Sequence, residues 1–485
     1  MSNKMIRMAT GVACALAACA AGPGQAVAKP SKPVSKANAA LVKAVDRYSA
    51  KLGYRRNATA AVTAAKLPTA VAAALASELN QLYSCDVITR ANVNTLVQMF
   101  DQFTGGHSGL PLGVPSVFPF PVQTQGSTVL GVPVPPAPNP PVYQQYPFQP
   151  QTEKCGAAVV TKLDAVKKAL AGAKHVGAKQ SIDLWPVLRF SPGKGHHTYN
   201  NDYVLLVDTG SHNTFNNNAG GNAIDIWRGP AGQHAAITAP ARGCIDAFDI
   251  IRAQTCAIAS AALLDTGSHN TFGVKTAPDP QTDGMCTNTP LESRVFVQGT
   301  GILGVGVLID EGSNNTFTGK VLTTGTGHVG GYGYLRVDGD HNNYSVIRDG
   351  LGDAVVGGTG YLIANGSHNT YSYYTAAPIN PFASSGTLGS GGVVDDLNNC
   401  DAGQGITLGS GEVAGVGHFV AVGGHNSYNA TQDSLGSGTV AGKGTFSSTG
   451  SGGTNVYSGP GLTGGRGTGQ TVAPTSTDNG SFTDS

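Results

Sequence analysis

The chain has 485 residues, of which 68 are glycine, and only 12% carry a charged side chain. Its formal net charge of +1 provides no basic field for nucleic acid or for an anionic membrane surface, so the composition disfavours a nucleic-acid role. Beyond the N-terminus no run approaches the roughly 18 apolar residues that a spanning helix needs. We therefore expect no transmembrane segment.

Residues 1–28 have the pattern of an export signal. Basic residues precede an apolar run from Met8 to Ala21, and Ala26-Val27-Ala28 offers small residues for cleavage. We therefore expect a secreted protein. The alternative is that Leu16-Ala17-Ala18-Cys19 acts as a lipobox, which would leave a lipid-anchored protein with the lipid on Cys19.

Six cysteines remain once this signal is removed, and they are Cys85, Cys155, Cys244, Cys256, Cys286 and Cys400. An even number in an exported chain suggests three disulfides. Cys244 with Cys256 is the pair that we favour, because these two flank one short loop. The partners of the other four are open, and the alternative is that some cysteines stay reduced and buried.

Three segments are expected before the repeats. Residues 29–103 are rich in alanine, and their apolar residues recur at helical spacing, which predicts two or three helices acting as a cap, a stalk or a partner-binding module. Residues 104–154 are rich in proline and predict an extended segment. Residues 155–180 contain an amphipathic helix that we expect to cap the open end of the repeat core.

One phrase returns throughout residues 181–458. Its copies include Gly306–Phe317, Gly333–Tyr344 and Gly360–Tyr371, and the period is about 27 to 29 residues. Its central asparagine recurs at Asn213, Asn270, Asn315, Asn342, Asn369, Asn426 and Asn455, with a degraded copy at Asn398. The long step from Asn213 to Asn270 predicts one turn without the phrase between them.

The columns of the aligned copies each have a physical reading. Leucine at one position points inward, and glycine at another fits a tight turn. Phenylalanine or tyrosine opens the following strand and can stack on its neighbours, while the asparagines can form a hydrogen-bonded ladder at a corner. The chain is therefore predicted to be mainly β, a right-handed parallel β-helix of about 27–29 residues per turn with an α-helical N-terminal region. We expect residues 459–485 to be a disordered tail.

The phrase, together with Gln298-Gly299 and the run Ile182–Val187, resembles an uncharacterised family of secreted bacterial repeat proteins with copies such as G-V-G-x-L-x-D-x-G-G-N-D-T-Y. The resemblance covers about Ile182 to Tyr457. It implies a β-helix-like repeat and no established activity. Here Ser-His-Asn or Asp-His-Asn stands where Gly-Asn-Asp would be expected, which removes a carboxylate from each corner.

Two columns could bind metal ions. Asp208, Asp265 and Asp310 share one column and are candidate calcium ligands, although later copies have no acid there and the aspartates can instead bond to turn amides. Histidine fills another column, and its members are His212, His269, His341, His368 and His425. His341 and His368 lie in adjacent turns and are candidates for metal capture or pH sensing, whereas the alternative is an imidazole stack that serves turn geometry. No cofactor other than calcium is indicated.

We expect a structural or binding protein with no evident catalytic site, whose partner is a glycan or a cell-envelope component. The alternative is a carbohydrate-active enzyme, a polysaccharide lyase or hydrolase, on the same scaffold. Such an enzyme needs acids grouped on one face. Asp225, Asp246 and Asp249, in the irregular first half, are the candidates.

Overall fold

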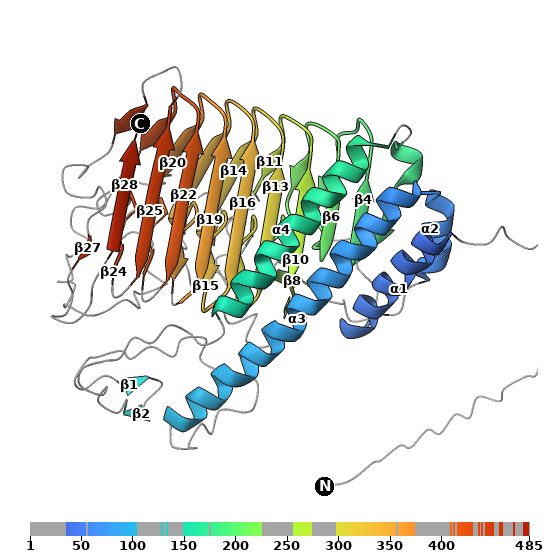
Figure 1. Ribbon diagram of the computed structural model, residues 1–485, viewed down its shortest axis with the longest axis horizontal. Coiled ribbons are helices and arrows are strands. Elements are labelled where there is room, and N and C mark those ends of the chain that lie inside the picture. The colour runs from blue at the N-terminus through green and yellow to red at the C-terminus, as the bar shows by residue number, and fades with distance from the viewer. Residues whose placement is uncertain are drawn as a thin grey trace, which may run out of the picture. The chain divides into compact units, whose positions relative to one another are not determined.

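The computed structural model describes residues 35–54, 57–103, 128–129, 132–133, 149–173, 176–225, 256–273, 297–355, 357–373 and several short ranges between 408 and 484. All of these residues belong to one compact unit, Ser35–Ser485. The fold of this unit is mainly β, with parallel sheets and a group of helices near its N-terminal side (Figure 1).

The helices of the described ranges precede most of the strands. They are α1 (Lys36–Lys51), α2 (Ala58–Ala65), α3 (Thr69–Phe103), α4 (Gln149–Ala171) and the short 3₁₀ helix η1 (Ala178–Gln180). Ser35 and Asn57 cap α1 and α2, since each side chain accepts a hydrogen bond of 3.2 Å from a backbone N–H three residues later. Pro68 precedes α3, where its missing N–H leaves no helical hydrogen bond unmade.

Most described strands fall into three sheets. The ten-stranded sheet has the order β28 (Asn479–Asp484), β25 (Lys443–Thr449), β22 (Val416–Val422), β19 (Thr359–Asn365), β16 (Tyr332–Asp338), β13 (Val305–Asp310), β10 (Ala261–Asp265), β6 (Leu205–Asp208), β4 (Leu188–Ser191) and β3 (Ile182–Leu184). The eight-stranded sheet has the order β26 (Val456–Ser458), β23 (Ser427–Asn429), β20 (Thr370–Tyr373), β17 (Asn343–Gly350), β14 (Thr316–Thr323), β11 (Thr271–Phe272), β7 (Thr214–Phe215) and β5 (Thr198–Tyr199). The six-stranded sheet has the order β12 (Gly301–Ile302), β15 (Gly327–His328), β18 (Ala354–Val355), β21 (Gly411–Glu412), β24 (Gly438–Thr439) and β27 (Gly469–Gln470).

Two further pairs of described strands stand apart from these sheets, and both pairs are antiparallel. They are β1 (Thr128–Val129) with β2 (Val132–Pro133) and β8 (Ala223–Asp225) with β9 (Cys256–Ile258). The pair β1 and β2 lies inside the segment predicted to be extended. Within the three large sheets every pairing is parallel except that of β3 with β4.

The pairing register aligns the columns of the repeat. Leu308 pairs with Leu335 and Leu335 with Leu362 in the ten-stranded sheet, while Phe317 pairs with Tyr344 in the eight-stranded sheet. From β12 onward, consecutive strands of the chain enter the six-, ten- and eight-stranded sheets in turn. Each repeat thus contributes one strand to each sheet, and its neighbours in every sheet are the repeats before and after it.

Two long steps of the repeat, from Asn213 to Asn270 and from Asn369 to Asn426, each join neighbouring layers. The predictions of an extra turn in the first step and of a degraded copy forming a layer in the second are therefore wrong. Strand β6 pairs directly with β10, so no turn of the stack separates Asn213 from Asn270. In the same way β20 pairs directly with β23, and Asn369 bonds to Asn426. The degraded copy at Asn398 lies outside the described residues and is not a layer between these two. Both long steps are therefore insertions in the connections between layers.

Two apolar clusters account for the alternation of buried side chains along the ten-stranded sheet. One face contributes Leu206, Leu263, Leu308 and their equivalents to a cluster with the aromatic column. The other face, in its first half, contributes Val207 and Leu264 to a cluster with the helices. Strands buried on both faces read as continuous apolar runs, as β6, β10 and β13 do. By contrast, β22 alternates between buried and more accessible positions.

Helix α4 lies along a face of the ten-stranded sheet rather than over the end of the core, and this corrects the predicted cap (Figure 1). Asp164 of α4 pairs with Arg336 of β16 at 2.6 Å, and the Gln149 side chain donates to the carbonyl of Gly358 at 3.2 Å. Gly156 permits close packing, because a Cβ built there would stand 2.1 Å from the ring of Tyr332. The helix also begins at Gln149, inside the predicted extended segment.

The prediction of a disordered tail is also wrong, because residues 459–485 contain paired strands. Strand β28 pairs with β25 over six residues, so that Phe482 stands beside Phe446, and β27 pairs with β24. The phrase weakens here but the period does not end. The aromatic residue keeps its place in the stack, with 5.1 Å between the Phe446 and Phe482 rings.

Candidate functional site

The turn between the ten-stranded and eight-stranded sheets is built on Ser-His-Asn or a variant of it. Its central residue has a left-handed backbone, with φ of 62° at His212 and 60° at Asn314. Asparagine and histidine tolerate this conformation better than β-branched residues. The central N–H donates to a carbonyl of the next layer, as from His212 to Ser268 at 2.9 Å and from His341 to Ser367 at 3.0 Å. The histidine backbone is therefore fixed by the stack.

The asparagine after each histidine forms a buried ladder. Oδ1 of Asn342 accepts the N–H of Asn315 at 2.8 Å, and the N–H of Asn342 donates to Oδ1 of Asn369 at 2.8 Å. Its amide also donates to the carbonyl of Gly339 at 2.8 Å. The same bond joins the other layers, namely Asn213 to Asn270, Asn270 to Asn315, Asn369 to Asn426 and Asn426 to Asn455. Both the oxygen and the nitrogen of these side-chain amides are thus engaged in holding the corner.

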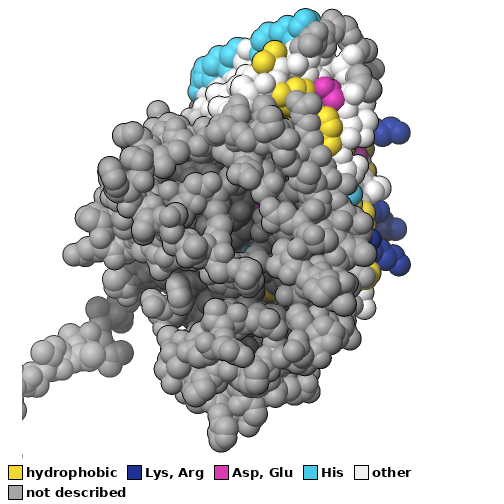
Figure 2. Space-filling view, turned by 90° about the vertical axis from the view of Figure 1, so that its left-hand side faces the viewer, with side chains coloured by type: hydrophobic (Ala, Val, Ile, Leu, Met, Phe, Trp, Pro, Cys, Tyr) yellow, Lys and Arg dark blue, Asp and Glu magenta, His cyan; other side chains and the backbone are white. Residues whose placement is uncertain are grey.

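The histidine side chains, in contrast, are exposed. Figure 2 shows histidine side chains gathered in rows along one edge of the molecule. The exposed members are His196, His212, His269, His341, His368 and His425, and Asn314 occupies the same position between His269 and His341. We call this set the histidine column.

Neighbouring rings of the histidine column stack closely. The centroids of His212 and His269 are 4.8 Å apart with 4° between the ring planes, and those of His341 and His368 are 4.9 Å apart with the same angle. His425 continues the second stack at 4.9 Å, and His196 lies at 5.0 Å from His212 with a tilt of 54°. Imidazole groups are thus presented to solvent at the spacing of the strands.

The aromatic column lies on the inner side of the eight-stranded sheet and supports the histidine column. Phe272 and Phe317 stack with centroids 4.6 Å apart, and Tyr344 follows Phe317 at 4.9 Å. These side chains are fully buried. Stacked rings at the strand spacing keep successive turns in register.

The aspartate column faces the interior. Asp208, Asp265 and Asp310 pair in register and are fully buried. Asp208 accepts the N–H of Gly210 at 2.5 Å, and Asp310 accepts the amide of Asn315 at 2.6 Å. Burial raises the pKa of all three carboxyls above the usual range of aspartate. Their geometry is that of turn support, and carboxyls whose charged form is disfavoured by burial are poor calcium ligands.

The acids proposed for catalysis are not brought together in the described residues. Asp225 lies in β8, where its backbone pairs with that of Cys256 in β9. Asp246 and Asp249 lie outside the described residues, as do Cys244, Cys286 and Cys400. The favoured pairing of Cys244 with Cys256 therefore also falls outside them.

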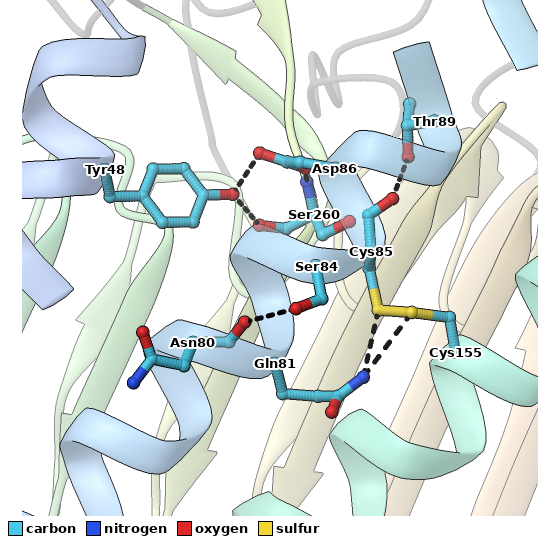
Figure 3. The surroundings of a disulfide bond; sticks show 9 residues. All are labelled: Tyr48, Asn80, Gln81, Ser84, Cys85, Asp86, Thr89, Cys155 and Ser260. Carbon is cyan, nitrogen blue, oxygen red and sulfur yellow. Dashed lines mark hydrogen bonds between the residues drawn. A yellow bond between two sulfur atoms is a disulfide. The ribbon is translucent and has the colours of Figure 1, made fainter. Parts of the chain in front are cut away.

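Cys85 and Cys155 form a disulfide that joins α3 to α4 (Figure 3). The amide of Gln81 lies 3.5 Å from the sulfur of Cys155. The bond fixes the two helices against each other on the face of the ten-stranded sheet.

Asp86 is an anchor that no sequence pattern identified. Its carboxylate accepts hydrogen bonds from the Tyr48 hydroxyl and from the backbone N–H of Ser260 (Figure 3). It also pairs with Lys51. Burial raises the pKa of Asp86, and the charge of Lys51 opposes that shift. The network connects α1, α3 and the residue before β10. The only feature of the sequence that could have indicated this anchor is a single acidic residue on the apolar side of a helix.

Among the residues that the structure describes, no group of three or more histidine, cysteine or acidic side chains is arranged to hold a metal ion. No helix in these ranges is long and apolar enough to cross a membrane. Comparison with protein-family models, with curated proteins and with solved structures finds no match to the chain. The assignment of function therefore depends on the chemistry of the repeat itself.

Proposed function

We propose that the chain is a secreted or surface-attached structural and binding repeat protein. In this proposal the three sheets are the three sides of a right-handed parallel β-helix with about 27–29 residues in a turn without insertions. The parallel pairing of successive repeats in each sheet supports this architecture. The likeness of its phrase to secreted bacterial G-G-N-D-T-Y repeat proteins points in the same direction.

The observation that carries the proposal is the division of the repeat between inside and outside. Leucine, aromatic and asparagine columns are buried and make scaffold contacts, whereas the histidine column is exposed. Beside that column the outer face of the eight-stranded sheet presents small polar side chains. They are Thr214, Thr271, Thr316, Asn343, Thr370 and Ser427. Regular, uncharged and polar, this face suits an extended partner with its own repeat, such as an envelope glycan.

Co-sedimentation with purified, insoluble envelope polysaccharide tests this function. We expect the wild-type protein to sediment with the polysaccharide, and the double variant Thr271→Glu and Thr370→Glu to lose at least tenfold in affinity. The matched control is Thr445→Glu on the outer face of β25, which should bind as the wild type does. A wild-type protein that sediments with no envelope polysaccharide would refute the proposed binding role.

The second candidate is a carbohydrate-active enzyme on the same scaffold, for which Asp225, Asp246 and Asp249 are the candidate acids. Release of reducing or unsaturated sugar ends from a glycan by the purified protein, abolished by Asp225→Ala or Asp249→Ala, would establish it in place of a purely structural role. Mass spectrometry of the mature N-terminus separates free secretion from lipidation at Cys19.

A further inference from the structure

The turn does not require imidazole at the exposed position. Asn314 has the same left-handed backbone as the five histidines from His212 to His425, with φ of 60° against 62° at His269 and 59° at His341, and it too is exposed. Its N–H makes the same bond to the next layer, here to the carbonyl of Asp340 at 3.0 Å. Asparagine therefore satisfies the corner, so turn geometry alone does not account for a column of six histidines.

Asn314 divides the histidine column into two runs of three. The first run is His196, His212 and His269, and the second is His341, His368 and His425. Within each run every ring has a neighbour at 4.8 to 5.0 Å. Between the runs the column is interrupted by a side chain that is a poor ligand for a transition metal.

The spacing within a run suits a shared metal ion. In parallel rings like nitrogens stand about as far apart as the centroids, whereas two nitrogens on one tetrahedral Zn²⁺, at ~2.1 Å each, are about 3.4 Å apart. Each ring tip must therefore move by less than ~1 Å, and each ring must also turn by ~55°, half the tetrahedral angle, because the nitrogen lone pairs of parallel rings point in parallel directions. The histidine side chains are exposed, so rotation about χ1 and χ2 can supply this turn. Solvent on the open side can complete the coordination shell, and neutral imidazole is a preferred ligand of Zn²⁺, Ni²⁺ and Cu²⁺.

We infer that each run of the histidine column binds one divalent transition-metal ion through two adjacent imidazoles, with water as the remaining ligands. One run holds one ion, because a ring engaged with one neighbour is not available to the other. Two-ligand sites of this kind do not need three convergent protein groups. The carboxylate of Asp340, exposed beside His341, adds a negative charge near the second run. The inference rests on the surface proposed above for binding, and it names a ligand for that surface.

Calorimetric titration of the untagged protein with Zn²⁺ tests it, with variants chosen within one run. His368→Asn removes the middle ring and leaves His341 and His425 about two strand spacings apart, too far to share an ion. His341→Asn removes the same group but leaves the stacked pair of His368 and His425 at 4.9 Å. We expect His368→Asn to bind one equivalent of zinc fewer than the wild type, and His341→Asn to bind the same number.

The variant Asn314→His tests the opposite change, the gain of a zinc site. It would join the two runs into seven adjacent rings, which make three separate pairs, so the variant should bind one equivalent more than the wild type. Because the turn already accepts asparagine at Asn314, we expect each variant to fold, and far-UV circular dichroism checks this. Equal stoichiometry for His368→Asn and His341→Asn, or a wild type that binds no zinc, would overturn the inference.

Comparing variants removes any background from other histidines and cysteines of the chain. The titration contains no polysaccharide, so its failure leaves the proposed envelope binding untouched. Conversely, loss of polysaccharide binding with normal zinc stoichiometry would overturn the proposed function alone.

Discussion

Asn342→Ala should destabilise the stack by about 3–5 kcal/mol. The side chain of Asn342 is 1% exposed, accepts the N–H of Asn315 and donates to the carbonyl of Gly339, both at 2.8 Å. Each bond contributes about 1 kcal/mol net, and a buried N–H left without an acceptor costs a further ~1–3 kcal/mol. Asn343→Ala is the matched control, because the side chain of Asn343 is exposed and its backbone bond is unchanged.

Equilibrium urea unfolding followed by circular dichroism measures the free energy of unfolding. Because stacked repeats can unfold in parts, hydrogen exchange of the Asn315 amide provides the local readout. We expect this amide to exchange faster in Asn342→Ala and at the wild-type rate in Asn343→Ala. The ladder would lose its assigned role if Asn342→Ala changed the unfolding free energy by less than ~0.5 kcal/mol and left that amide protected.

Three other perturbations have defined outcomes. Burial lowers the pKa of His328 to about 3, so the folded state keeps it neutral and stability is lost as the pH falls from about 6.5 toward 3. At pH 5 that loss is about 2 kcal/mol. In His328→Val, which introduces the residue that Val355 supplies in the same column, the melting temperature should fall less from pH 7 to pH 5 than it does in the wild type. An equal fall in the two proteins would contradict this prediction. Burial raises the pKa of Asp265, so its contribution to stability is lost as the pH rises above the usual aspartate range, and Asp265→Asn should flatten the decrease in urea midpoint between pH 5 and pH 8. An unchanged slope would argue against a buried, protonated carboxyl. The double variant Cys85→Ala and Cys155→Ala removes a disulfide between residues 70 positions apart, so the free energy of unfolding should fall by about 4 kcal/mol. A melting temperature equal to that of the oxidised wild type would refute this prediction.

The irregular parts of the chain show where sequence periodicity misleads. A spacing of 57 residues between Asn213 and Asn270 equals two ordinary steps, yet the two asparagines bond directly. An insertion that leaves and re-enters the same layer produces such a spacing without adding a layer. Local sequence cannot distinguish these cases, because the difference lies in which strands pair.

The helices give a second example. Their existence follows from the spacing of residues such as Leu41 and Val45, but their place on the ten-stranded sheet does not. That place depends on contacts between distant residues, such as Asp86 with Ser260 and Asp164 with Arg336. A helix that packs on a sheet and a helix that caps a core present similar apolar stripes.

The sequence by itself determined the repeat, the asparagine and aromatic columns and the histidine column, because these follow from a side chain's position within one period. The tertiary structure decided which copies are neighbours, which cysteines pair and which columns reach solvent. Aspartate and histidine columns look equally available in the sequence. They separate in the fold. The aspartates turn inward, where burial raises the pKa of their carboxyls, while the left-handed turn directs the histidines outward.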